Sequence, residues 1–182
     1  KNINGLSNQS TPISAIPSTI PDAPTNLAAI HGDTSVDLTW TMPTNNGGNA
    51  ISEYAIYTNP VGPSGNPIFT NAATTSFTVI GLTNGTSYTF RVSAKNINGL
   101  SNQSTFVSAT PSTTPGAPIN FTVSSGGNGV LELSWDSPLN TGGAPITNYE
   151  YSENANFSQF VTTTLTTATI VGKNNNQTYT YY

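Results

Sequence analysis

Residues 88–104 read Tyr-Thr-Phe-Arg-Val-Ser-Ala-Lys-Asn-Ile-Asn-Gly-Leu-Ser-Asn-Gln-Ser and contain the two signals that decide the fold. In the first half, apolar residues occupy every second position from Tyr88 to Ala94, which is the alternation of a β-strand with one buried face. The second half, residues 95–104, recurs unchanged at residues 1–10. Identical stretches 94 positions apart indicate a tandem repeat, and a unit of that length can bury a core of its own.

The repetition continues outside the quoted stretch. Trp40 and Trp135 are 95 residues apart, whereas Tyr88 and Tyr179 are 91 apart. Short length changes therefore fall between the repeated positions, which is typical of surface loops that join strands.

The phase of the repeat predicts three segments and two connections. These are the last strand of a preceding repeat at residues 1–19, a complete domain at 20–114, and a second domain without its last strand at 115–182. Proline-rich residues at 20–24 and 113–118 join them, and proline predicts an extended, rather stiff backbone there.

Alternation recurs along the complete domain. Within residues 35–41, Val36, Leu38 and Trp40 face one way and Asp37 faces the other. Other short runs, separated by glycine, asparagine and proline, lie at residues 26–30, 51–58, around 69, 77–82, 88–94 and 106–109. Seven short strands without a helical period predict an all-β sandwich.

Several motifs of the complete domain form a set: Pro21-x-x-Pro24-x-Asn26-Leu27, Trp40, Gly47-Gly48-x-x-Ile51-x-x-Tyr54, and Leu82-x-Asn84-Gly85-Thr86-x-Tyr88-x-Phe90-x-Val92-x-Ala94-x-Asn96. With these motifs the chain resembles tandem fibronectin type III repeats of a secreted or surface-exposed structural protein, bacterial or viral. The resemblance implies tandem immunoglobulin-like β-sandwiches, with strands A, B and E in one sheet and C, C′, F and G in the other. It also implies that the Tyr88 hydroxyl bonds back to the loop after Leu82.

The second copy departs from this pattern at Lys173, which stands where the first copy has Leu82. A lysine must bring its ammonium group to water, so we expect a looser loop at residues 173–177. The copy ends at Tyr182, midway along its sixth strand. The residues expected to form the two cores are Leu38, Trp40, Val79, Tyr88, Leu133, Trp135 and Tyr179.

Composition narrows the function classes. Charged residues make up 7% of the chain, and four Lys and Arg residues cannot form the clustered basic surface that nucleic acid requires. No apolar run is long enough for a membrane-spanning helix. Cysteine is absent, which excludes disulfides and thiolate metal sites.

No residue set indicates catalysis, a metal or a cofactor. His31 is the sole histidine, and Arg91, the sole arginine, lies inside a strand. The glycine-rich residues 124–129 fit a hairpin turn and lack the lysine of a phosphate loop. The carboxylates considered for calcium are too dispersed for its loop motif: Asp33, Asp37, Glu53, Asp136, Glu150 and Glu153. We therefore expect a non-enzymatic protein without cofactors.

Two further sets of surface residues are candidate sites, one for glycosylation and one for carbohydrate binding. Asn-x-Ser/Thr glycosylation sequons occur at Asn8, Asn84, Asn102, Asn120, Asn156 and Asn176, which is about the number that chance gives in so asparagine-rich a chain. Tyr57, Tyr149 and Tyr151 are candidates for a row of exposed aromatics that would bind carbohydrate, although packing in the sheets is the simpler use.

The primary functional hypothesis is a structural or interaction module: a spacer, stalk or fibre in an extracellular, cell-surface or virion-surface array. One alternative is a set of accessory domains in a secreted polysaccharide-active enzyme. Another is an adhesin module that binds a cell-surface protein or carbohydrate.

The expected partner is the protein itself, as neighbouring repeats or subunits of a linear array. Residues 1–16 resemble residues 95–110, which complete the first domain. They could add to the second domain of another copy as its last strand, through Ile3, Leu6, Ile13 and Ile16. One long covalent array is the equal alternative.

Overall fold

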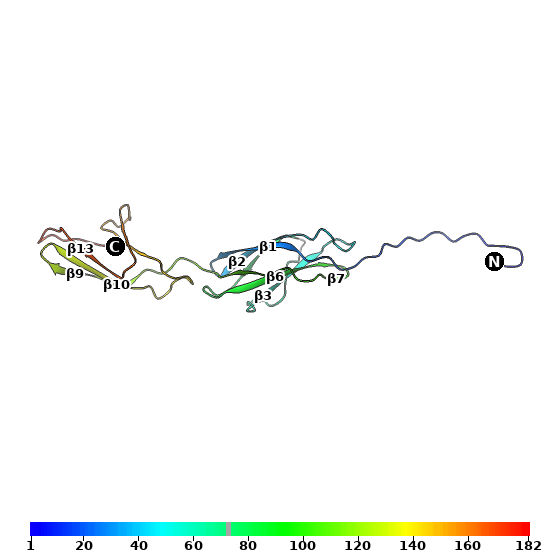
Figure 1. Cartoon of the computed structure of the whole chain (residues 1–182), viewed down its shortest axis with the longest axis horizontal. Coiled ribbons are helices and arrows are strands. Elements are labelled where there is room, and N and C mark those ends of the chain that lie inside the picture. Colours follow the sequence, from blue (N-terminus) through cyan, green and yellow to red (C-terminus); the bar gives the residue numbers. More distant parts are fainter. Residues whose placement is uncertain (72–73) are drawn as a thin grey trace.

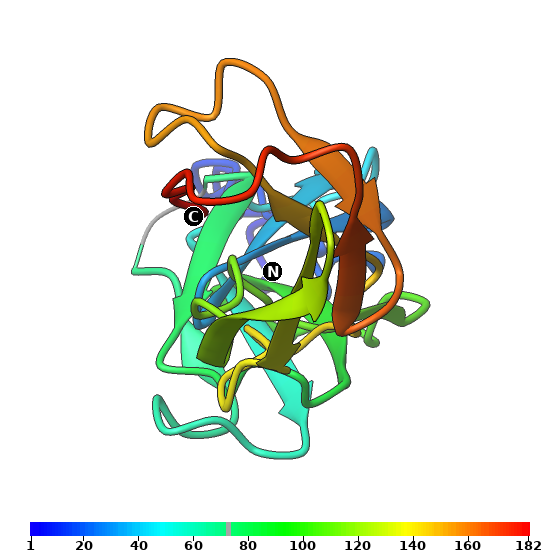
Figure 2. The same cartoon turned by 90° about the vertical axis from the view of Figure 1, so that its left-hand side faces the viewer.

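The computed structural model describes residues 1–71 and 74–182 and contains strands but no helix in those ranges. Two β-sandwiches lie end to end, and residues 1–16 run away from the first as an extended segment (Figure 1). Figure 2 looks along the long axis, with the second sandwich in front of the first. The all-β tandem architecture is confirmed. No described helix is long and apolar enough to cross a membrane.

One sheet of the first domain consists of β1 (Thr25–Gly32), β2 (Ser35–Thr41) and β5 (Ser76–Ile80), in the order β1-β2-β5. All its pairings are antiparallel. Strand β2 has the bounds that the alternation predicts, with Val36, Leu38 and Trp40 buried. This is the sheet that the resemblance implies for strands A, B and E.

The second sheet contains the remaining strands of the first domain. Its order is β4-β3-β6-β7, and β8 also pairs with β6. The strands are β3 (Glu53–Asn59), β4 (Ile68–Phe69), β6 (Tyr88–Asn96), β7 (Gly99–Leu100) and β8 (Val107–Ala109). They correspond to strands C, C′, F and G of the resemblance.

The first core lies between these sheets. It is formed by Val36, Leu38, Trp40, Ile51, Tyr54, Ile56, Val79, Leu82, Tyr88, Phe90, Val92 and Ala94. The backbone N–H of Thr83 donates to the Tyr88 hydroxyl at 3.2 Å, which is the corner bond that the resemblance implies.

The second domain repeats the arrangement with shorter strands. One sheet has the order β13-β10-β9, and the other pairs β11 with β12. The strands are β9 (Ile119–Gly127), β10 (Val130–Asp136), β11 (Tyr149–Tyr151), β12 (Val161–Thr163) and β13 (Thr167–Ile170). The glycine-rich residues 124–129 form the end of β9 and its hairpin turn into β10, as expected.

The core of the second domain is smaller. Leu133, Trp135 and Tyr181 are buried. The expectation that Tyr179 is buried is wrong, because this residue is half-exposed and packs at the edge of the cluster. The N–H of Asn174 donates to the Tyr179 hydroxyl at 3.1 Å. Tyr179 therefore makes the same corner bond in the second domain that Tyr88 makes in the first.

The sixth strand expected around Tyr179 to Tyr182 is not formed as a regular strand. Ser152 and Tyr182 exchange two backbone hydrogen bonds, of 3.1 and 2.9 Å. At the repeat offsets of 95 and 91 residues they match Tyr57 and Arg91, which pair in the first domain. The pairing expected between β11 and the sixth strand is therefore present at one residue pair, Ser152 and Tyr182.

The expected strand at residues 1–16 is not formed either. A strand needs a partner for its N–H and C=O groups, and no backbone hydrogen bond joins residues 1–16 to another described part of the chain. Asn2 nevertheless pairs with Gly5 as Asn96 pairs with Gly99, so the repeated stretch encodes its turn locally. The apolar side chains of the segment, Ile3, Leu6, Ile13 and Ile16, are 83 to 99% exposed. Their role in assembly stays a prediction.

Candidate functional site

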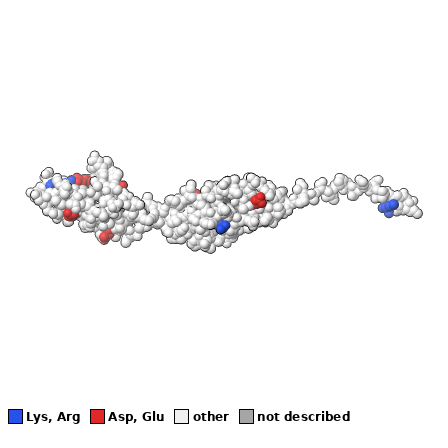
Figure 3. Space-filling view, viewed as in Figure 1, with Lys and Arg blue, Asp and Glu red and all other residues white. Residues whose placement is uncertain are grey.

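The six candidate calcium carboxylates are dispersed; five bond to a nearby side chain, and the sixth, Glu150, lies exposed on β11. Asp33 bonds Asn84, Asp37 bonds Thr78, Glu53 bonds Lys95, Asp136 bonds Asn120 and Glu153 bonds Lys173. Among the described residues, no group of three or more His, Cys, Asp and Glu side chains could hold a metal ion. On the face shown in Figure 3, charged side chains are few and scattered.

His31 lies at the end of the first domain that faces the second. Its Nδ1 is 3.1 Å from the Ser112 hydroxyl, on the segment that leaves the first domain. The backbone N–H of Ser112 also donates to the Gly32 carbonyl at 3.1 Å. His31 therefore contacts the segment that leads from the first domain to the second.

The aromatic candidates do not form a row. Tyr149 and Tyr151 pack against Trp135, with ring centroids 5.7 and 6.2 Å apart, and the Tyr149 hydroxyl lies 2.6 Å from that of Ser137. Tyr57 lies in the first domain, where it is half-buried. Two of the three rings therefore belong to the margin of the second core.

A cavity of about 270 Å³ opens beside Trp135. It is lined mostly by apolar residues, including Phe121, Tyr149, Tyr151 and Phe157. Trp135 is itself a core residue, and Tyr149 and Tyr151 pack against the same core, so the cavity adjoins the core. Its lining has the character of packing surface rather than of a polar ligand site.

The sequons differ in what their asparagines do. Asn84 is half-buried; its amide donates to Asp33 at 2.8 Å and its carbonyl oxygen accepts from the Thr34 N–H at 2.9 Å. A glycan on Asn84 would replace one of the two hydrogens of this amide and would have to fit beside Asp33. The exposed sequon asparagines are Asn8, Asn102, Asn120, Asn156 and Asn176.

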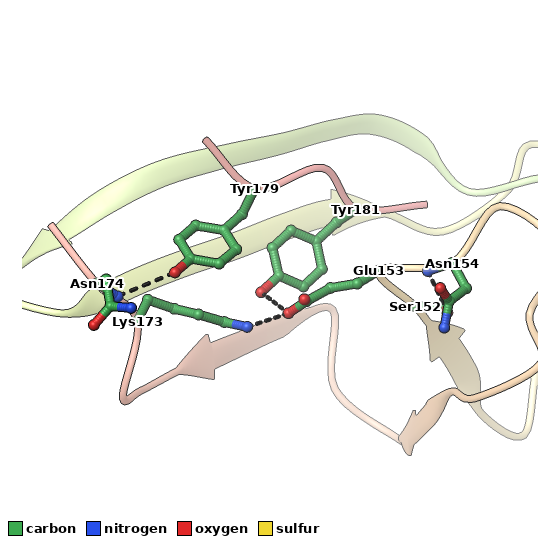
Figure 4. Close-up of polar contacts among 7 residues, drawn as sticks. All are labelled: Ser152, Glu153, Asn154, Lys173, Asn174, Tyr179 and Tyr181. Atoms are coloured by element: carbon green, nitrogen blue, oxygen red, sulfur yellow. Dashed lines mark hydrogen bonds and ion pairs between the residues drawn. The ribbon is translucent and has the colours of Figure 1, made fainter. Parts of the chain in front are cut away.

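Lys173 is the centre of a polar cluster on the second domain (Figure 4). Its ammonium group forms an ion pair with Glu153 and lies 4.6 Å from the ring centroid of Tyr179. The Tyr181 hydroxyl donates to the same Glu153 oxygen at 2.5 Å. At the position of Leu82, the lysine therefore places its ammonium group over the tyrosine rings and pairs its charge with Glu153.

The loop after Lys173 is held by further bonds. The N–H of Lys173 donates to the Gly129 carbonyl at 3.0 Å, and the N–H of Gly129 donates to the Asn175 side chain at 3.1 Å. The expectation that the lysine loosens this loop overlooked a partner that lies 20 residues away in sequence.

The contacts within this cluster shift the pKa values of three side chains. The hydrogen bond from Lys173, and next that from Tyr181, lowers the pKa of Glu153. The bond to Glu153 raises the pKa of Lys173, and burial raises the pKa of Tyr181. When folding lowers the pKa of a carboxyl group, the fold is stabilised at pH values above the pKa of that group in the unfolded chain. When folding raises a pKa, the fold is stabilised at pH values below the pKa of that group in the unfolded chain.

We expect Lys173→Leu to raise the free energy of unfolding of the second domain by about 1 kcal/mol, because a buried leucine gains more than a solvent-screened ion pair loses. Leu82 at the equivalent position is 2% exposed. In the unmodified chain, stability should fall as the pH drops below about 4.5, the usual value for glutamate, because the unfolded chain then takes up a proton at Glu153 more readily than the folded chain. It should also fall as the pH rises above about 10, the usual value for tyrosine, because Tyr181 and Lys173 lose their protons more readily in the unfolded chain. Urea unfolding across this pH range checks both effects.

Glu153→Gln is the control for the pH dependence, since it keeps the lysine but removes the titrating carboxylate. It should flatten the acid side of the profile. A Lys173→Leu variant that is less stable than the unmodified domain at neutral pH would contradict this view of the cluster.

A second polar cluster, the N-terminal clasp, ties the entering chain to the first domain. It joins Thr19 to the loop between β2 and β3, where the Thr19 N–H donates to the Gly47 carbonyl at 2.8 Å. The buried Asn96 amide donates to the carbonyls of Thr19, at 2.7 Å, and Asn46, at 2.9 Å. Asn98 donates to Thr19 as well, at 3.0 Å.

Sequence reasoning missed the role of this clasp. The available signal is that the pair Gly47-Gly48 recurs in the second copy as Gly142-Gly143. The sequence alone gives no reason for this recurrence. A Cβ atom at Gly47 would lie 2.2 Å from the Thr19 carbonyl oxygen. Glycine is therefore required because two backbones approach closely there.

Comparison with known proteins identifies the first domain. Residues 22–110 match the family model described as "Fibronectin type III domain". This range contains β1 to β8, so the first sandwich is a fibronectin type III domain, as the resemblance implied.

Similar regions occur in larger enzymes. The chain is 32% identical over 179 residues to Chitinase A1 of Niallia circulans, a match that covers 90% of this chain and 24% of the relative. It is 29% identical over 154 residues to Endoglucanase B of Cellulomonas fimi, covering 79% of this chain and 14% of the relative. The chain thus spans about a quarter or less of the length of these relatives.

One solved structure with a similar fold is a crystal structure of domains from titin. It is 33% identical, with a TM-score of 0.45, and the match covers 51% of this chain and 32% of that chain.

Proposed function

We propose that these residues form a non-catalytic spacer within an extracellular, polysaccharide-active enzyme. The observation that carries the proposal is the similarity of nearly the whole chain to regions of a chitinase and an endoglucanase. Because the relatives are enzymes, they support this role better than the free-standing stalk or fibre that the repeat alone suggested.

The site geometry is compatible with a spacer. Asp33, Asp37, Glu53, Asp136 and Glu153 bond to neighbouring polar or basic side chains rather than to one another, and His31 contacts Ser112. A glycosidase needs two carboxyl groups placed across a sugar-binding groove, one as acid and one as base or nucleophile. Hydrolysis would therefore be carried out by a separate catalytic domain, and these sandwiches would set its distance from whatever anchors the enzyme.

The test uses the longer protein that contains these residues. Residues 22–182 are replaced by a flexible Gly-Ser linker of the same number of residues. Hydrolysis of a soluble oligosaccharide should be unchanged, whereas hydrolysis of the insoluble polymer should fall on the order of 2- to 10-fold, because the catalytic domain is no longer held at a set reach.

A second replacement, by an unrelated rigid domain pair, is the matched control and should restore activity on the insoluble polymer. A longer protein that degrades no polysaccharide, or whose activity on the insoluble polymer survives the flexible replacement, contradicts the proposal.

A further inference from the structure

We infer that the junction between the two sandwiches is a built interface that fixes the second domain on the first, so that the pair behaves as a single stiff rod. The inference concerns the geometry of this chain alone. It is separate from the enzymatic context proposed above and can fail independently of it.

The first observation is that the linker is bonded to the first domain up to Ser112. The N–H of Gly85, in the turn before β6, donates to the Pro111 carbonyl at 2.9 Å. The N–H of Ser112 donates to the Gly32 carbonyl at 3.1 Å, and its hydroxyl contacts His31. Pro111 is itself fully buried, so the linker leaves the first domain as part of its packed end.

The second observation is that the next residue is already bonded to the second domain. The N–H of Thr113 donates to the Gly142 carbonyl at 2.8 Å, and the N–H of Gly116 donates to the Asn140 carbonyl at 2.8 Å. No unbonded residue separates Ser112 from Thr113. A hinge needs a few residues that are free to change φ and ψ, and this junction lacks them.

The same pair of bonds is present at the other end of the first domain. Thr19 donates to the Gly47 carbonyl and Asp22 to the Asn45 carbonyl, at 2.8 and 3.0 Å. These residues are the repeat equivalents of Thr113, Gly142, Gly116 and Asn140. The clasp is therefore a property of the repeat.

The third observation is a direct contact between the two domains. A Cβ atom on Gly143 would lie 2.4 Å from the backbone nitrogen of Gly85 and 2.8 Å from the carbonyl carbon of Asn84. A Cβ atom on Gly85 would in turn lie 3.3 Å from the Gly143 Cα. Two glycines thus let the end of one domain lie directly on a loop of the next, and any side chain at Gly143 must separate them.

The first domain contains a position equivalent to Gly143 at which no other domain lies close. Gly48 is the repeat equivalent of Gly143, with φ of 84° against 88°. A Cβ atom there would meet nothing closer than 3.5 Å, and Gly48 is exposed whereas Gly143 is half-buried. Gly48→Ala and Gly143→Ala therefore carry the same backbone strain, but only the second pushes the domains apart.

The experiment measures the distance between one label on each domain. Because the chain has no cysteine, Ser76→Cys in the first domain and Thr162→Cys in the second give unique sites for spin labels on exposed strand positions. Double electron–electron resonance should give one narrow distance distribution for the parent pair and for Gly48→Ala. Gly143→Ala should broaden it by about twofold or more, towards that of a flexible linker.

A second variant covers the case in which Gly143→Ala disturbs the second domain itself, which a red shift of Trp135 fluorescence would reveal. Insertion of Gly-Ser between Ser112 and Thr113 leaves both sandwiches intact and separates the two sets of bonds. It should broaden the distribution likewise. A broad distribution in the parent chain, or a narrow one after the insertion, overturns the inference, as does an equal response to Gly48→Ala and Gly143→Ala with both domains folded.

Discussion

Replacing Trp40 with alanine is expected to lower the free energy of unfolding of the first domain by about 3–5 kcal/mol. The indole is 5% exposed and meets the Tyr54 ring edge-on, with centroids 5.1 Å apart. Its removal leaves a large cavity between two sheets that cannot collapse onto each other. Since a domain of this size is stable by about 5–15 kcal/mol, the variant should be close to unfolding.

Amide hydrogen exchange of β2 and β6 measures this loss without relying on the deleted fluorophore. Thr39→Ala on the exposed face of β2 is the control and should change the stability by less than about 0.5 kcal/mol. Trp135 fluorescence should show an unchanged second domain. If the protection of β2 survives Trp40→Ala, the indole does not lie in the core and the register of β2 is wrong.

Asn96→Ala is expected to lower the stability of the first domain by about 1–3 kcal/mol, because it removes two hydrogen bonds donated by a buried amide, each worth about 0.5–1.5 kcal/mol. The Asn96 side chain is 1% exposed and donates to the carbonyls of Thr19 and Asn46. Its own oxygen accepts from the Asn98 N–H at 2.8 Å. The loss should be accompanied by faster exchange of the Thr19 amide, since the clasp opens with it.

Two variants separate the hydrogen bonds from the change in volume. Asn96→Asp keeps the shape but cannot donate, so it should destabilise at least as much as alanine. Asn98→Ala removes an exposed donor to the same Thr19 carbonyl and should cost less than about 1 kcal/mol. Equal stabilities for Asn96→Ala and Asn98→Ala would contradict the account of the clasp.

The sandwich was predictable wherever a local pattern decides the structure. Alternation in residues 35–41 predicts β2 with its observed bounds, and the alternation from Tyr88 to Ala94 predicts β6, which extends two residues further to Asn96. The turn at Asn96 to Gly99 forms even in its isolated copy at residues 1–10. The alternation of a strand has a period of two residues, and this turn spans four residues. Both can be predicted from the sequence because all the residues that form the signal lie in one short stretch.

The contacts that define the candidate sites were not predictable in this way. Asn96 bonds Thr19 across 77 residues, and Lys173 bonds Glu153 across 20. Nothing in either local sequence indicates the partner, so the sequence assigns Asn96 no contact and predicts that Lys173 loosens its loop. By analogy with Tyr88, Tyr179 is expected in the core, but the Lys173 ammonium group lies over its ring and the residue is only partly buried.

The most direct test of the central claim, that this pair of sandwiches is non-catalytic, is reducing-end release from chitin and from glucan by the purified 182-residue chain. The account predicts no release above the buffer blank at any pH at which both domains are folded. Release that disappears on His31→Ala or Glu153→Gln, while Trp40 and Trp135 keep their native fluorescence, would contradict it.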